Sequence, residues 1–262
     1  ENPLSSAGDH HHVPWFQCPC CPPNVARTIA SVGKYFYSTG PGALWVHLFA
    51  GSDADLAVDG QTVHISQETF YPWNGMVELT LTPAQPQTFT LHLRVPGWCR
   101  SITLAVNGAT LDLHPDADGY LAISREWQPG DKVNYNMAMP IEAVWANPAV
   151  RHLEGRVAIQ RGPIVYCLEG VDHDMMILDR ISVDPAAIPT FKAEWQPDLL
   201  GGVVTIRGEG QAVEDSAAGG WGETLYRSGP APTQSPIAIV AVPYCVWDNR
   251  DPGEMRVWLR AG

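Results

Sequence analysis

The chain has 262 residues, a formal net charge of −12, 45% hydrophobic residues and 17% charged residues. This composition is typical of a folded globular protein, and the length suffices for one large domain or two of ordinary size. An acidic chain without a basic run argues against nucleic-acid binding, because phosphate contacts need clustered Lys and Arg. No apolar run reaches the roughly 18 residues of a membrane helix.

The first 22 residues show no periodicity and indicate a loop. Because the chain begins with Glu1 in the middle of a motif, we expect its natural N-terminus to lie upstream, and the missing signal peptide decides nothing about export. One helix is predicted after Pro22-Pro23, since proline suits a first helical turn, and Gly40-Pro41 should end it. Its apolar face is marked by residues at helical spacing: Val25, Ile29, Val32 and Phe36.

After Pro41 the pattern alternates with the period of a strand. Asp59-Gly60 and Asn107-Gly108 supply the positive φ angles of tight hairpin turns. Strands are predicted at 44–49, 56–58, 62–65, 89–95, 102–106, 109–113, 120–124 and 132–139. Strand signals this close together, without helices between them, indicate an antiparallel sandwich.

A second set of strands is predicted at 156–160, 164–168, 176–178, 203–207, 237–242 and 255–259, with a long loop over 208–235. The expected fold is therefore mainly β. It consists of a loop and helix at 1–40, a first antiparallel sandwich at 41–146 and a second at 147–262.

The chemically distinctive residues are Cys18, Cys20 and Cys21, which stand just before the predicted helix. The positive end of a helix favours thiolate over thiol, and thiolate is both a nucleophile and a zinc ligand. Spacing alone leaves three interpretations open: a metal-bound or reactive thiolate, a structural zinc knot, or cysteines that are either inert or joined in a Cys20–Cys21 disulfide.

The other three cysteines, Cys99, Cys167 and Cys245, stand singly among predicted strands and resemble small buried hydrophobes. No disulfide framework is indicated, which favours a reducing, cytoplasmic setting.

Several runs of the chain resemble glycoside hydrolase family 127, the β-L-arabinofuranosidases. They are Glu1-Asn2-Pro3-Leu4, Gly8-Asp9-His10-His11, Trp15-Phe16 and Cys20-Cys21-Pro22-Pro23-Asn24-Val25-Ala26-Arg27 near the start, and Arg94-Val95-Pro96-Gly97-Trp98, Val106-Asn107-Gly108, Gly119-Tyr120 and Trp127-Gln128-Pro129-Gly130-Asp131 in the first sandwich. In the second sandwich they are the run from Arg161-Gly162-Pro163 to Glu169, Pro243-Tyr244, Trp247-Asp248-Asn249-Arg250 and Gly253-Glu254-Met255.

The resemblance implies a retaining, exo-acting glycosidase with an (α/α)₆ barrel followed by two β-sandwiches. This chain would be its C-terminal part, lacking most of the barrel, with residues 1–40 as a helical remnant. Cys20 would be the nucleophile, and Zn²⁺ would be held by Cys20, Cys21 and Cys18. A Glu upstream of this chain would be the general acid and base.

The resemblance also leaves the remaining zinc ligands open. The Glu-x-Cys pair that the family carries before its Cys-Cys pair is missing from the short loop between Leu4 and Asp9. Asp9, His10 and Glu1 are therefore further candidates beside Cys18.

The expected partner is a carbohydrate substrate, and the C-terminal sandwich is a candidate surface for a homodimer. The fragment alone should be inactive, since one helix cannot form a barrel. The alternative is a non-catalytic β-sandwich module for carbohydrate binding or subunit association.

Overall fold

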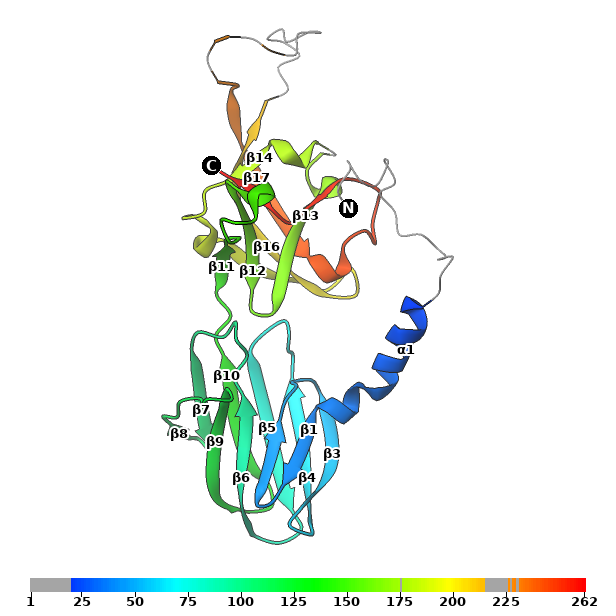
Figure 1. Ribbon diagram of the computed structural model, residues 1–262, viewed down its shortest axis with the longest axis vertical. Coiled ribbons are helices and arrows are strands. Elements are labelled where there is room, and N and C mark those ends of the chain that lie inside the picture. Colours follow the sequence, from blue (N-terminus) through cyan, green and yellow to red (C-terminus); the bar gives the residue numbers. More distant parts are fainter. Residues whose placement is uncertain (1–19, 175, 215–225, 227, 230) are drawn as a thin grey trace. The chain divides into compact units, whose positions relative to one another are not determined.

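The computed structural model describes residues 20–174, 176–214, 226, 228–229 and 231–262. These residues divide into two compact units, one ending at Met139 and the other beginning at Pro140 (Figure 1). Both units are built mainly from strands, and the described residues contain one α-helix. The mainly β fold expected from the sequence is confirmed. Within the same residues, no helix combines the length and the apolar character needed to cross a membrane.

The first unit starts with helix α1 (Cys21–Ser31), which runs into the short 3₁₀ helix η1 (Val32–Tyr35). The helical segment ends earlier than predicted, because strand β1 (Tyr37–Gly40) takes the residues before Pro41. Gly40-Pro41 therefore belongs to the turn between two strands and does not stop a helix. The apolar face is also left bare: Val25, Ile29 and Val32 are 56%, 69% and 39% exposed.

Two sheets form the body of this unit, and the strands are antiparallel except for one parallel pair, β2 with β6. The four-stranded sheet has the order β1, β2 (Ala43–Val46), β6 (Gln87–Arg94) and β9 (Tyr120–Trp127). The six-stranded sheet has the order β3 (Ser52–Val58), β4 (Gln61–Thr69), β5 (Met76–Pro83), β10 (Asp131–Met137), β7 (Ile102–Val106) and β8 (Ala109–Leu111).

Turn chemistry fixes the two predicted hairpins of the six-stranded sheet. Asp59 and Gly60 have φ angles of 48° and 80°, and Asn107 and Gly108 have 50° and 81°. Two successive positive φ angles match the twist of the flanking strands. Both hairpin predictions are confirmed, whereas β5 was missed although its apolar residues alternate regularly.

The core of the unit consists of apolar side chains that the two sheets direct toward each other. Trp127 is fully buried, and its indole N–H donates to the carbonyl oxygen of Phe89 at 3.0 Å. Tyr135 is buried with its hydroxyl 3.2 Å from the carbonyl oxygen of Arg94. Both large side chains thus bury their apolar surface without leaving a polar atom unpaired.

The second unit contains one nine-stranded set of pairings, formed by β11 (Ile141–Val144), β12 (Arg156–Arg161), β13 (Ile164–Glu169), β14 (Ile181–Val183), β15 (Lys192–Gln196), β16 (Val203–Val213), β17 (Gln234–Pro243), β18 (Met255–Arg256) and β19 (Leu259–Ala261). Six of these strands close into a ring, in the order β12, β19, β14, β16, β17, β13 and back to β12. Short 3₁₀ helices connect them: η2 (Arg151–Leu153), η3 (Gly170–Asp172), η4 (Leu178–Arg180), η5 (Ile188–Thr190) and η6 (Tyr244–Val246).

Several details of the second unit differ from the sequence-based expectation. Strands β14 and β15 were not predicted, and the predicted strand at 255–259 is divided between β18 and β19. Residues 176–178 form no strand, and η4 begins there instead. The expected loop over 208–235 is shorter, because β16 extends to Val213 and β17 begins at Gln234. Residues 140–146 lie in the second unit, because β11 pairs with β12.

Gly75 offers a test of how tightly the first unit is packed. A β-carbon at this position would lie 1.8 Å from the carbonyl oxygen of Met137, which is backbone and has little room to move. We expect Gly75→Ala to lower the free energy of unfolding by about 3 kcal/mol or more, measured by urea denaturation. Gly97→Ala is the matched control, since nothing lies within 4 Å of its added β-carbon. Equal losses in the two variants would contradict the packing described.

Candidate functional site

Cys20 and Cys21 lie at the start of helix α1, with Cys20 as the residue before its first turn. Both thiols are free and exposed, so they do not form the disulfide that the sequence left open. Their Sγ atoms are 3.8 Å apart. The carbonyl oxygen of Cys20 accepts the first helical hydrogen bond, from the N–H of Asn24 at 3.3 Å. The chain thus presents two thiols side by side, anchored by the helix that follows.

Pro22 and Pro23 determine the character of this helix end. Proline fits the first turn because its φ is already helical, but it has no N–H to offer. Within the described residues no side chain caps the helix, and no acidic residue lies in its first turn. The sulfurs therefore face fewer unpaired N–H groups than at an ordinary helix end, and the helix dipole contributes less positive potential than the sequence suggested.

The motif residues that follow the prolines brace the first turn. The Arg27 guanidinium donates to Oδ1 of Asn24 at 2.9 Å. The Thr28 hydroxyl donates to the carbonyl oxygen of Asn24 at 2.9 Å. These bonds hold Asn24 in the turn and so fix the backbone on which the two cysteines stand.

The remaining predicted site residues, Cys18, Asp9, His10 and Glu1, lie outside the described residues. In the part of the chain that the structure describes, no three His, Cys, Asp or Glu side chains come together as a metal site would require. The structure thus brings together two of the predicted ligands, Cys20 and Cys21.

The three scattered cysteines differ from one another. Cys167 is buried, as predicted, and burial raises the pKa of its thiol. Cys99 is half-buried, and burial likewise raises its pKa, while its Sγ lies 3.2 Å from the carbonyl oxygen of Ser101. Cys245 is exposed, so its assignment as a buried hydrophobe was wrong. It follows the buried end of β17 and lies in η6, where the chain turns outward.

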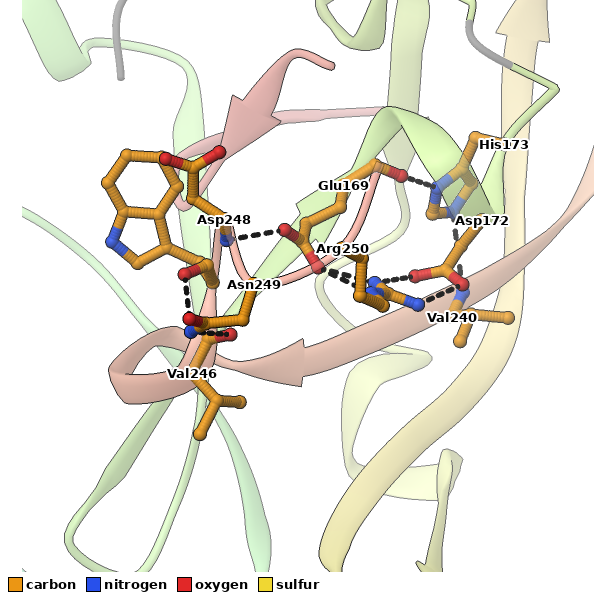
Figure 2. A network of polar contacts seen from close by, with 9 residues as sticks. Glu169, Asp172, His173, Val240, Val246, Asp248, Asn249 and Arg250 are labelled. Carbon is orange, nitrogen blue, oxygen red and sulfur yellow. Dashed lines mark hydrogen bonds and ion pairs between the residues drawn. The ribbon is translucent and has the colours of Figure 1, made fainter. Parts of the chain in front are cut away.

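A polar network in the second unit surrounds Arg250 (Figure 2). Its guanidinium donates to both carboxylate oxygens of Asp172, at 2.8 and 2.6 Å. It also donates twice to Oε2 of Glu169, once through Nε at 3.1 Å and once through Nη2. The other oxygen of Glu169 accepts the N–H of Asp248 at 2.8 Å. Every side chain of this ion-pair triad is at most 17% exposed.

His173 extends the same network inward. It is buried, and its Nδ1 lies 2.8 Å from the carbonyl oxygen of Glu169, to which it donates. Its Nε2 accepts the N–H of Val240 at 3.4 Å, so the two contacts require a neutral imidazole with the proton on Nδ1. The network ties the end of β13 and helix η3 to the loop that carries Arg250. From the sequence, Glu169 and Arg250 were recognised only as parts of motifs, although two acids three residues apart are a signal for a cation partner.

Replacing Arg250 tests whether this network stabilises the second unit. Arg250→Met leaves two largely buried carboxylates unpaired, which should lower the free energy of unfolding by about 3–5 kcal/mol. Arg207→Met is the control, because Arg207 pairs with Glu194 at 2.8 Å and both side chains are 47% exposed. That variant should lose less than about 1 kcal/mol. Thermal and urea unfolding measure both losses, and an equal, small loss in the two variants would refute a structural role for Arg250.

Two protein-family models match the chain. The middle domain of glycoside hydrolase family 127, described as β-L-arabinofuranosidase, matches residues 43–139, and the C-terminal domain of the same family matches residues 141–260. The non-reducing end β-L-arabinofuranosidase of Bifidobacterium longum subsp. longum is 37% identical over 95% of this chain and 38% of its own length.

Solved structures agree with these matches. A family 127 β-L-arabinofuranosidase from Geobacillus stearothermophilus T6 is 45% identical, with a TM-score of 0.90 over 97% of this chain and 39% of its own. A second family 127 β-arabinofuranosidase is 35% identical, with a TM-score of 0.86 over 97% of this chain and 40% of its own. The chain therefore spans about two fifths of the length of these relatives. It belongs to glycoside hydrolase family 127, and it carries that family's middle and C-terminal domains.

Proposed function

We propose that this chain supplies the cysteine pair and the two β domains of a retaining, exo-acting β-L-arabinofuranosidase. The observation that carries the proposal is the pair of free thiols 3.8 Å apart at the start of α1, in a chain of this family. Relatives over the same region are named β-L-arabinofuranosidases. Association of two copies through the second unit belongs to the same proposal.

Cys20 is the proposed nucleophile. Its sulfur attacks the anomeric carbon while the bond from that carbon to the leaving oxygen breaks, and the sugar becomes bound to sulfur. Water then attacks the same carbon and breaks the carbon–sulfur bond. Two displacements at one carbon retain its configuration. A protonated Glu, which the family resemblance places upstream of this chain, gives its proton to the leaving oxygen and later takes one from the water.

The two thiols fit a zinc site. Two thiolates on one tetrahedral zinc, each about 2.3 Å from the metal, have sulfur atoms roughly 3.8 Å apart, and Cys20 and Cys21 show a separation of 3.8 Å. Cys20 and Cys21 would hold the metal, with Cys18 as the third sulfur ligand. Bound zinc supplies positive charge that keeps a neighbouring sulfur deprotonated. That contribution matters here, because Pro22 and Pro23 reduce the positive potential that the helix end itself supplies.

The exposed apolar face of α1 is an argument that activity requires a larger helical assembly. Val25 and Ile29 are more than half exposed. An isolated helix of 11 residues is marginal in water, and such a face is normally buried against other helices. An (α/α)₆ barrel would cover it and would form the sugar pocket beside the cysteines. We therefore propose that the chain by itself does not hydrolyse glycosides.

The metal proposal can be tested on this chain. The reduced protein, loaded with zinc and separated from free metal, should retain close to one zinc per chain by elemental analysis. Cys21→Ser should weaken zinc binding at least about tenfold, because a hydroxyl is a poor substitute for a thiolate ligand. Cys245→Ser, which removes an exposed thiol elsewhere, should leave binding unchanged. Equal zinc in wild type and Cys21→Ser would exclude the cysteine pair as ligands.

The catalytic proposal needs a longer protein that includes this chain together with the helical region of its relatives. That protein should release the aryl group of an aryl β-L-arabinofuranoside, and Cys20→Ala should reduce kcat/KM by about a thousandfold or more. Cys245→Ala should leave kcat/KM unchanged. This chain alone should show no turnover. Hydrolysis by the chain alone, abolished by Cys20→Ala, would overturn the dependence on other helices.

A further inference from the structure

The outer face of the six-stranded sheet in the first unit contains a hollow of about 680 Å³. Alternation in β5 and β10 directs Leu79 and Tyr135 into the core and leaves Glu78 and Asn134 on the outside. Strand register aligns one row of outward residues across five strands: Glu68, Glu78, Asn134, Ala105 and Thr110. The small side chain of Ala105 stands between Asn134 and Thr110 in this row and leaves the space that its neighbours border.

Glu78 is held in a fixed position at the edge of the hollow. Lys132 donates to its Oε1 at 2.5 Å, and the amide of Asn134 donates to its Oε2 at 2.9 Å. The hydrogen bond from Lys132, together with that from Asn134, lowers the pKa of Glu78, so the group is a carboxylate at neutral pH. Each carboxylate oxygen keeps a further lone pair for a ligand hydroxyl.

A second row supplies additional polar groups and apolar surface. Asn136 lies opposite Met76 on one side and Thr103 on the other. Among the described residues, Asn136, Thr103 and Thr110 make no side-chain hydrogen bond with one another or with the rest of the protein, so they are available to a ligand. Phe70 is 49% exposed at the end of the hollow and offers part of an aromatic ring.

We propose that this hollow binds a neutral saccharide, namely a short chain of arabinofuranosyl units, apart from the cysteine site. Acceptors and donors fixed around an open concave surface match sugar hydroxyls, and an exposed ring matches the apolar face of a sugar. The volume lies within the roughly 300–1,000 Å³ usual for small-ligand sites. The choice of sugar rests on the proposed function, whereas the site itself does not use Cys20.

The charge at the hollow disfavours other occupants. Glu68 and Glu78 stand opposite each other, and the single positive charge of Lys132 offsets their two negative charges in part, so a phosphate chain would meet net repulsion. The centres of protein–protein interfaces are depleted in charged residues, and here the ion pair of Glu78 and Lys132 borders the centre. A neutral polyhydroxylated ligand is not repelled by the carboxylates, and it does not place the ion pair at the centre of a protein–protein interface.

Isothermal titration calorimetry of this chain with linear arabinohexaose tests the proposal. Wild type should bind saturably, and Cys20→Ala should bind equally well, which separates this site from the proposed catalytic one. Phe70→Ala and Asn136→Ala should each weaken binding about tenfold, the loss expected for one stacking contact or one hydrogen-bonding group. Asp55→Asn, an exposed substitution on the same sheet outside the hollow, is the control and should bind as wild type.

Circular dichroism of each variant establishes that the fold is kept. Absence of saturable binding by wild type would overturn the proposal, and so would binding that survives both Phe70→Ala and Asn136→Ala. Sedimentation provides a second measurement. A dimer of the chain that Phe70→Ala dissociates would assign the face to a second copy instead. Failure of the catalytic proposal would be seen in a separate experiment. In that case the longer protein would hydrolyse the glycoside equally well with and without Cys20→Ala.

Discussion

Burial of one face of each sheet is the constraint on which the first unit depends. The four-stranded and six-stranded sheets direct alternate residues toward each other, and the shared core contains fully buried side chains such as Leu91, Leu79 and Trp127. Because the period of a strand is two, every residue committed to the core leaves its neighbour on the outside. Burial of Leu79, Tyr135 and Met137 therefore places their neighbours Glu78, Asn134 and Asn136 on the outer face. The packing of the core thus determines the geometry of the outer hollow.

Helix α1 lacks the partner that such burial requires. Its residues are joined to the first sheet through η1, but none of them is buried. The cysteine pair stands at the start of this helix, so the two exposed thiols belong to an element that buries no side chain. In the second unit, by contrast, the charged residues are packed. Arg250 and its two carboxylates form an ion-pair network that is largely removed from water and that stabilises the fold. The cysteine pair and the buried ion-pair network therefore lie in different segments of the chain.

The sequence predicted those features that depend on local chemistry. Asp59-Gly60 and Asn107-Gly108 placed two hairpins because a positive φ is a property of the turn itself. The spacing of Val25 and Ile29 predicted a helix, but period alone does not reveal what covers a face, and both residues are exposed. Strand β5 and the extension of β16 to Val213 were missed, since pairing with distant strands decides where a strand ends. The Arg250 network joins residues about 80 positions apart, so the local pair of acids could not show which cation binds them.

The position of the cysteine pair at the start of an exposed helix has a consequence for the proposed mechanism. A nucleophile must be held within a fraction of an ångström of its target, and this demands support from the elements around it. Within the described residues, Cys20 and Cys21 are fixed by the first turn of α1 and by the bonds around Asn24, and by nothing from the sheets. Under the proposed mechanism, precise placement would come from whatever covers the apolar face of α1 and from a metal bound between the two sulfurs. Neither contact is part of the cores of the β domains, so the proposed function is compatible with a chain that folds without being active.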